Sequence, residues 1–127
     1  GIDLSPEMLD EASHKGDYAS LLEVDLTTDF NHLPKGYAAI VSAGTFTHGH
    51  LGPEPLPRLL ALCRTGAEAA IGVNRKHFET HDFAITLEQL YDSARISEPR
   101  LHEVRIYDDT VSAHASDTAF ILNFKIL

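Results

Sequence analysis

The sequence contains no tryptophan, a single cysteine and no long hydrophobic run. Since Cys63 has no second cysteine to pair with, an internal disulfide is excluded, and we expect a cytoplasmic protein. No apolar stretch approaches the roughly 18–20 residues that a membrane-spanning helix needs, so we expect no membrane contact. Internal repeats and low-complexity tracts are absent as well. These absences indicate an ordinary globular domain.

Basic residues are also scarce. The 127 residues include 10 Lys and Arg against 19 Asp and Glu, which gives a formal net charge of −9. A surface with this balance repels the phosphates of nucleic acids, so we expect no nucleic-acid partner. With 43% hydrophobic and 23% charged residues, the chain has the composition and length of one globular domain.

Strand and helix patterns alternate along the chain. The clearest helix start is Ser5 as N-cap, with Pro6 in the first helical position, and Gly16 is its expected end. The clearest strand is the last one, in which apolar residues alternate with period two. The expected strands end at residue 3 and cover 21–24, 37–42, 69–73, 104–106 and 119–126; the other expected helices cover 54–64 and 86–94, with a loop at 43–53.

The order of these elements predicts an α/β fold with a mainly parallel sheet. Because no helix separates the last two strands, we expect them to form an antiparallel hairpin at the C-terminal side. An open parallel sheet binds ligands beyond the carboxyl ends of its strands. The residues that follow the early strands are therefore the candidates for a binding site.

Two acidic residues follow early strands. Asp3 has the two oxygens needed to accept both hydroxyls of a ribose, and the neighbouring Leu4 is suited to pack on a purine. Asp25 is suited to accept the exocyclic amine of adenine. Each also has a simpler interpretation: Asp3 as an acid before a helix start, and Asp25 as a solvated turn residue.

Considered together, these segments resemble the class I S-adenosylmethionine-dependent methyltransferases, in particular the methyltransferase-11/25-like group. The residues Ile2–Leu9 carry the most specific match, to the second strand of that family, its ribose-binding acid and the helix that follows. The resemblance continues to the family's third, fourth, fifth and seventh strands, in that order, at Leu22–Leu26, Tyr37–Thr45, Leu59–Val73 and Phe120–Leu127.

The resemblance implies a Rossmann-like sheet, the cofactor S-adenosylmethionine and a set of cofactor-binding residues. It implies that Asp3 holds the ribose, that Leu4 packs on the adenine, and that Asp25 with Leu26 reads the adenine amine. The residues implied beneath the methionine part of the cofactor, near the methyl acceptor, are Ser42, Ala43 and Gly44.

The family's first strand and its Gly-rich loop have no counterpart in the sequence. Residues 1–127 therefore correspond to a partial, N-terminally incomplete domain that runs from the second to the seventh strand. The missing strand is central in the family, so we expect a gap in the sheet with two unpaired edges. We expect a fragment of a longer protein; the alternatives are direct pairing of the second and fourth strands, or a strand borrowed from a partner, including self-association through the exposed gap.

The leading functional hypothesis is methyl transfer from S-adenosylmethionine to a small-molecule acceptor. The segment after the fourth strand reads Ser-Ala-Gly-Thr, not the Asn-Pro-Pro-Tyr of amide and adenine methyltransferases, and the acidic balance disfavours nucleic acid. A non-catalytic, degenerate methyltransferase fold that acts as a binding module is the alternative. A third hypothesis is one half of a nucleotide-binding oxidoreductase, since methyltransferases and these oxidoreductases both have an acid after a strand.

Eight histidines raise the questions of a general base and of a metal. His48 lies in the loop where an acceptor would enter, and a neutral imidazole there can accept a proton; the simpler interpretation is a loop histidine bonded to backbone. His77 and His81 are four residues apart, a spacing that allows both to bind zinc. No further ligand pattern supports such a site, so we expect no metal.

Overall fold

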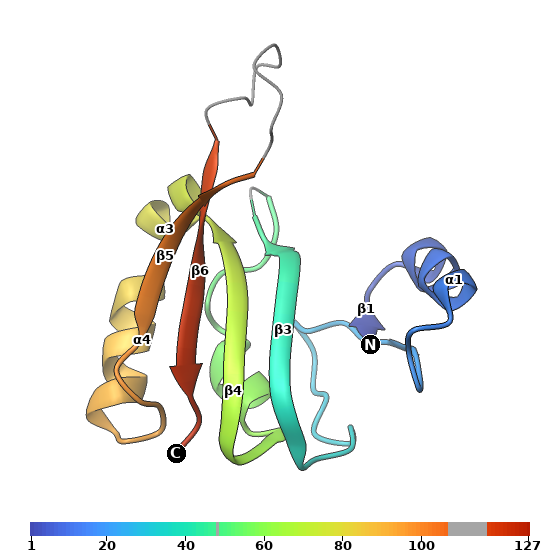
Figure 1. Ribbon diagram of the computed structural model, residues 1–127, viewed down its shortest axis with the longest axis horizontal. Coiled ribbons are helices and arrows are strands. Elements are labelled where there is room, and N and C mark those ends of the chain that lie inside the picture. Colours follow the sequence, from blue (N-terminus) through green and yellow to red (C-terminus); the bar gives the residue numbers. More distant parts are fainter. Residues whose placement is uncertain (48, 107–116) are drawn as a thin grey trace. The chain divides into compact units, whose positions relative to one another are not determined.

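A computed structural model describes residues 1–47, 49–106 and 117–127. The chain divides into two compact units, residues 1–33 and 34–127 (Figure 1). Strands of the described residues form two separate sheets, one in each unit. The alternative of direct pairing between the strand at residue 3 and the strand that begins at residue 37 is not seen, since each pairs within its own sheet.

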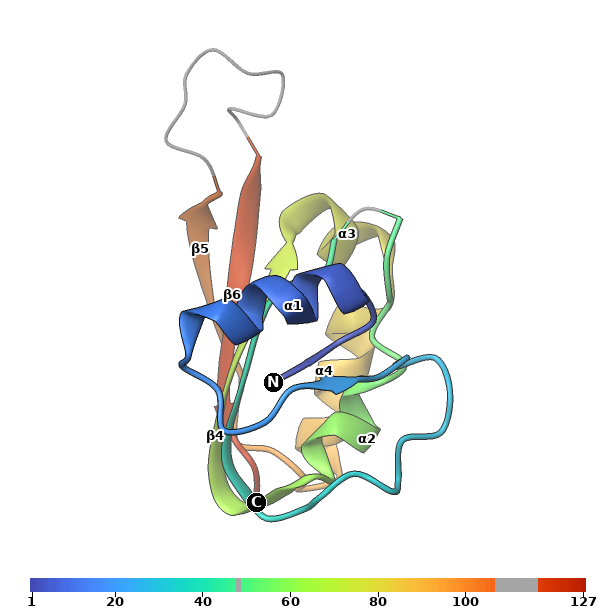
Figure 2. The ribbon, with the colours of Figure 1, turned by 90° about the vertical axis from the view of Figure 1, so that its right-hand side faces the viewer.

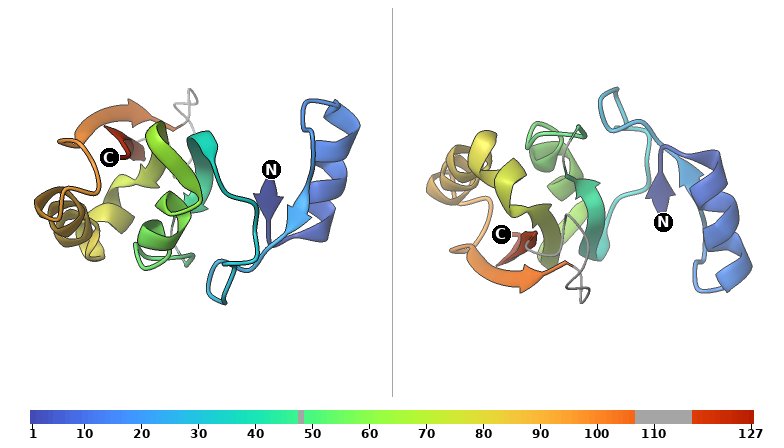
Figure 3. Two further views of the ribbon diagram at one scale, coloured as in Figure 1. Left: turned by 90° about the horizontal axis from the view of Figure 1, so that it is seen from below. Right: turned by 90° about the horizontal axis from the view of Figure 1, so that it is seen from above.

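The first unit contains β1 (Ile2–Asp3), α1 (Pro6–Lys15) and β2 (Leu22–Glu23). The two strands are parallel, and α1 connects them (Figure 3). As predicted, Ser5 caps α1: its Oγ accepts a hydrogen bond from the amide of Met8 at 3.2 Å. Gly16 ends the helix at a φ of 70°, a left-handed conformation that glycine adopts without a steric cost.

The second unit contains one four-stranded sheet in the order β3-β4-β6-β5. Its elements are β3 (Tyr37–Phe46), α2 (Leu56–Leu60), β4 (Cys63–Asn74), α3 (Arg75–Thr80), α4 (Phe83–Asp92), β5 (Arg100–Arg105) and β6 (Thr118–Lys125). β3 and β4 are parallel, whereas β6 is antiparallel to both β4 and β5. The predicted α/β class and the C-terminal antiparallel hairpin are confirmed.

Helices α2, α3 and α4 lie on the same side of this sheet (Figure 2). The apolar side chains between the helices and the sheet form the core of the unit, because burying them removes apolar surface from water. Fully or almost fully buried members are Leu56, Leu60, Ile71, Val73, Phe83, Leu87, Leu90 and Leu122. No helix in the described ranges is long and apolar enough to cross a membrane.

Several predicted boundaries are wrong. Ala43 and Gly44, expected in a loop, belong to β3, and Gly66, expected to stop a helix, lies in β4. The amide of Gly66 donates to the carbonyl of Ile126 at 2.7 Å, so pairing with a distant segment determines its conformation. α2 covers only residues 56–60 of the expected 54–64, and α4 begins at Phe83 rather than at residue 86. α3 was not predicted.

Candidate functional site

The carboxyl ends of β1 and β2 place two acidic residues at one edge of the first sheet. Asp3 pairs with Glu23 in the parallel register, and the amide of Val24 donates to the carbonyl of Asp3 at 2.9 Å. Asp25 follows directly. The sequence-predicted pair Asp3 and Asp25 therefore lies beyond the ends of adjacent parallel strands, which is the ligand-binding edge of such sheets.

Asp3 uses one carboxylate oxygen to fix the turn into α1. Its Oδ1 accepts a hydrogen bond from the amide of Ser5 at 2.9 Å. Among the described residues none donates a hydrogen bond to Oδ2, so this carboxylate oxygen is available to a ligand hydroxyl. The next residue, Leu4, is 61% exposed and presents apolar surface beside this carboxylate.

Asp25 is oriented by the residue two positions later. Its Oδ1 accepts hydrogen bonds from the amide of Thr27 at 2.8 Å and from the hydroxyl of Thr27 at 2.6 Å. The hydroxyl bond first, and then the amide bond, lower the pKa of Asp25 below its usual value, since both stabilise the carboxylate. Asp25 is therefore an ionised acceptor at neutral pH, and Leu26 beside it is half-buried.

In the second unit, β3 is irregular at its carboxyl end, where the implied methionine-contacting residues lie. Ser42 pairs with Ile71 and Phe46 pairs with Val73, so β3 advances four residues while β4 advances two. Gly44 has a φ of 79° inside this irregularity. The side chain of Ser42 donates to Oγ1 of Thr45 at 2.9 Å, which closes the bulged segment.

Gly72 of β4 lies directly against the bulged segment. A Cβ at this position would lie 3.3 Å from the carbonyl oxygen of Ser42 and 3.9 Å from the Cα of Ala43. This contact is closer than most side chains tolerate, so the absence of a side chain at Gly72 allows the two backbones to approach. The bulge thus exposes Ala43 and Gly44 at the carboxyl end of a parallel strand.

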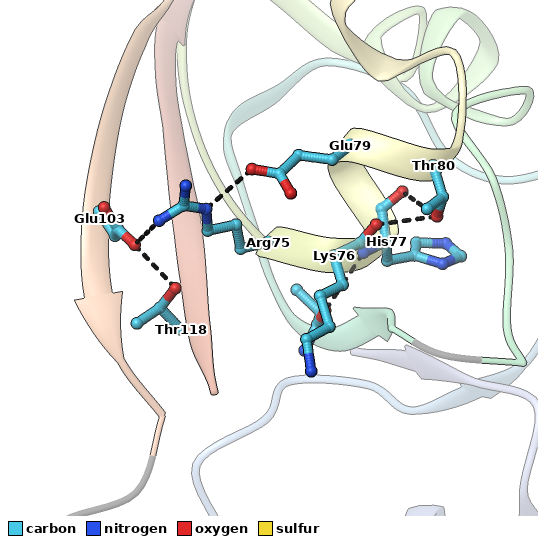
Figure 4. Close-up of polar contacts among 8 residues, drawn as sticks. Arg75, Lys76, His77, Glu79, Thr80, Glu103 and Thr118 are labelled. Atoms are coloured by element: carbon cyan, nitrogen blue, oxygen red, sulfur yellow. Dashed lines mark hydrogen bonds and ion pairs between the residues drawn. The ribbon is translucent and has the colours of Figure 1, made fainter. Parts of the chain in front are cut away.

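A charged cluster, not predicted from the sequence, lies at the same edge of the second unit (Figure 4). Arg75 donates through Nε to Glu79 at 2.8 Å and through Nη1 to Glu103 at 2.7 Å. The hydroxyl of Thr118 also bonds to Glu103, and together with Arg75 it lowers the pKa of that carboxyl. These residues, with Asn74, Lys76 and Asp117, line a pocket of about 280 Å³. The sequence gives no sign of this cluster, because Glu103 lies 28 residues after Arg75.

The histidines singled out in the sequence are His48, His77 and His81. His48 lies outside the described residues. His77 lies within α3 and His81 follows its last residue; their ring centroids are 4.0 Å apart, and His77 is buried. Among the described residues there is no group of three or more His, Cys, Asp or Glu side chains that could hold a metal ion.

Solved structures show what this arrangement is similar to. An rRNA methylase from Streptococcus thermophilus matches 99% of this chain and 71% of its own, with a TM-score of 0.57 and 12% identity. A protein from Clostridium thermocellum assigned as an rRNA methylase matches 100% of this chain and 74% of its own, with a TM-score of 0.56 and 14% identity. A protein from Streptococcus mutans assigned as a methyltransferase was solved in complex with S-adenosylhomocysteine. It matches 99% of this chain and 74% of its own, with a TM-score of 0.61 and 12% identity.

Neither a scan against protein-family models nor a search of curated proteins finds a match for the sequence. The structural matches nevertheless extend over essentially the whole chain and agree with one another. The chain therefore has the fold of the class I S-adenosylmethionine-dependent methyltransferases. The resemblance noted in the sequence is confirmed at the level of the fold.

The expectation of a small-molecule acceptor and no nucleic-acid partner is contradicted by these neighbours, two of which are described as rRNA methylases. The physical reason lies in where the charge sits along the chain. Residues 1–33 contain eight acidic and one basic residue, whereas residues 34–127 contain eleven acidic and nine basic residues. The net charge of −9 is thus mostly a property of the first unit and is a poor guide to the second.

Proposed function

We propose that this chain forms a methyltransferase domain that transfers a methyl group from S-adenosylmethionine to RNA. The observation that carries the proposal is the pair of acids, Asp3 and Asp25, at one edge of adjacent parallel strands in a chain with the methyltransferase fold. Residues 1–127 correspond to the second through seventh strands of such a domain.

The proposal assigns the nucleoside contacts to residues that follow β1 and β2. Oδ2 of Asp3 accepts a ribose hydroxyl, since Oδ1 already serves the turn. The exposed side chain of Leu4 packs on the adenine, and its 61% exposure makes that surface available. Asp25 accepts the adenine amine, with Leu26 beside it, and its lowered pKa keeps the carboxylate charged for this bond. The donor and acceptor chemistry of these residues fits an adenosine.

The proposal assigns the contacts to the methionine part of the cofactor to Ser42, Ala43 and Gly44. Ser42, Ala43 and Gly44 form a bulged strand end with exposed backbone and small side chains, which suits close approach of a ligand. When bound, the sulfonium cofactor supplies an already activated methyl group. The described residues then have only to bind and orient the cofactor and the acceptor, which matches the lack of an evident acid–base pair among them. His48 is the proposed base.

An RNA acceptor agrees with the distribution of basic residues. Nine of the ten Lys and Arg residues lie in residues 34–127, the unit whose strand ends face the acceptor in this proposal. Two of them, Arg75 and Lys76, follow β4 directly at its carboxyl end. Both are paired with carboxylates, Arg75 with Glu79 and Glu103 and Lys76 with Asp117. The main support for an RNA acceptor is therefore the likeness to two structures described as rRNA methylases.

The direct test is transfer of tritium from S-adenosyl-[methyl-³H]methionine to total ribosomal RNA by the full-length protein. We expect label in RNA that ribonuclease releases and protease does not. Label in protein or small molecules instead would overturn the RNA acceptor. Binding of S-adenosylhomocysteine without transfer to any acceptor would favour the non-catalytic binding module.

A further inference from the structure

One buried histidine connects two segments that are distant in the sequence. His77, on α3, is 2% exposed, and its Nε2 lies 2.7 Å from the carbonyl oxygen of Leu51, 26 residues earlier. Leu51 belongs to the 49–55 segment, which precedes α2. Because a carbonyl oxygen only accepts, Nε2 carries the proton and donates it.

The ring of His77 is fixed from several directions. The amide of His77 donates to Oδ1 of Asn74 at 3.2 Å, which anchors the backbone at the start of α3. The ring packs against His81 and Phe83, with centroids 4.0 Å and 5.6 Å away, and Phe83 meets Phe46 edge to face at 5.7 Å. His77 thus lies in an aromatic cluster that joins α3 and α4 to the end of β3.

An apolar side chain would fill this cluster as well as an imidazole does. It would, however, leave the carbonyl of Leu51 without its bond from His77. A buried polar side chain is retained at low cost only when it is hydrogen-bonded, and here the bond is to the 49–55 segment. The bond to Leu51 is therefore a reason for histidine at this position that packing alone does not provide.

We propose that His77 is a positioning residue for methyl transfer, which holds the 49–55 segment against α3 through its Nε2–H. This inference rests on the proposed function, because the bulged end of β3, with Ser42 and Gly44, leads into that segment. When the 49–55 segment is held in place, the carboxyl end of β3, where the acceptor enters in this proposal, keeps one conformation. His77 itself touches neither cofactor nor acceptor in this account.

The test compares three variants of the full-length protein. His77→Leu removes the donor, and His77→Gln restores a donor at about the same reach. His81→Leu removes the neighbouring ring and its Nδ1 contact with the carbonyl of His77, while the bond to Leu51 stays. We expect His77→Leu to lower kcat for methyl transfer to ribosomal RNA about tenfold, with the KM for S-adenosylmethionine nearly unchanged. We expect His77→Gln to recover most of the rate, and His81→Leu to stay near wild type.

Hydrogen–deuterium exchange provides a readout that does not depend on activity. Peptides covering the 49–55 segment take up deuterium faster in His77→Leu than in His77→Gln or His81→Leu if the bond holds the segment. Equal uptake in all three variants overturns the inference, as does a rate lost in proportion to thermal stability without rescue by glutamine. If the wild-type protein neither binds cofactor nor transfers methyl, the proposed function fails, while the exchange data still decide whether His77 holds the segment.

Discussion

Asp3 and Glu23 are partners in the parallel register of β1 and β2, so Asp25 follows at the same edge two residues later. This relationship brings together two carboxylates that are 22 residues apart in the chain. Each carboxylate accepts a hydrogen bond at its Oδ1 from a nearby amide, that of Ser5 for Asp3 and that of Thr27 for Asp25. The local bonds hold the carboxylates in defined orientations before any ligand binds.

The hydroxyl of Thr27 should control the ionisation of Asp25. We expect Thr27→Val to raise the pKa of Asp25 part of the way to its usual value, since the amide bond remains. A pKa lowered by folding stabilises the folded state above the unfolded pKa, and this stabilisation is lost as the pH falls through the folded pKa. Carboxyl ¹³C NMR titration measures the pKa of Asp25 in the wild-type protein and in Thr27→Val.

The control for this experiment is Thr28→Val. The Thr28 hydroxyl donates to the backbone carbonyl of Asp25, not to the carboxylate. We expect the pKa of Asp25 to stay lowered in this variant. Equal pKa values for Asp25 in Thr27→Val and in the wild-type protein would show that the hydroxyl bond does not orient the acid.

The close approach of β4 to the bulge of β3 should make Gly72 sensitive to substitution. We expect Gly72→Ala to lower the free energy of unfolding, and Gly72→Val to lower it by about 1–3 kcal/mol, because a side chain presses on the carbonyl of Ser42. Urea denaturation followed by circular dichroism measures the difference. Wild-type stability of Gly72→Val would show that the backbones can separate without cost.

The single thiol should react slowly. Burial raises the pKa of Cys63, so at pH 8 a smaller fraction is thiolate than in an exposed cysteine. We expect reaction with Ellman's reagent to be slower in the folded protein than in the same protein unfolded in urea, and to speed up as the pH rises. Equal reaction rates in the folded and the unfolded protein at pH 8 would show that burial does not protect Cys63.

Local rules in the sequence predict the carboxyl ends of the first two strands well. The capping pattern at Ser5 and the strands that end near Asp3 and Asp25 depend on neighbouring residues only, so their positions follow from the chain itself. The hairpin of β5 and β6 follows from the absence of a helix between two strands. These features were enough to predict the fold class.

Features that depend on distant partners could not be predicted. Ala43 and Gly44 belong to β3 because β4 pairs alongside, and α3 forms where Asn74 caps a six-residue helix too short for a periodic pattern. The bond of Arg75 to Glu103 joins residues 28 positions apart. The acceptor prediction was wrong because the net charge of a chain averages two units with different balances.

The central claim is that Asp3 holds the ribose of S-adenosylmethionine. Isothermal titration calorimetry of the full-length protein with S-adenosylhomocysteine tests it, using Asp3→Asn and, as a charge-matched control on the same unit, the exposed Asp17→Asn. We predict that Asp3→Asn raises the Kd on the order of tenfold or more, equivalent to about 1.4 kcal/mol or more, and that Asp17→Asn leaves it unchanged. Equal affinity of Asp3→Asn and the wild-type protein, or no binding by the wild-type protein, would contradict the claim.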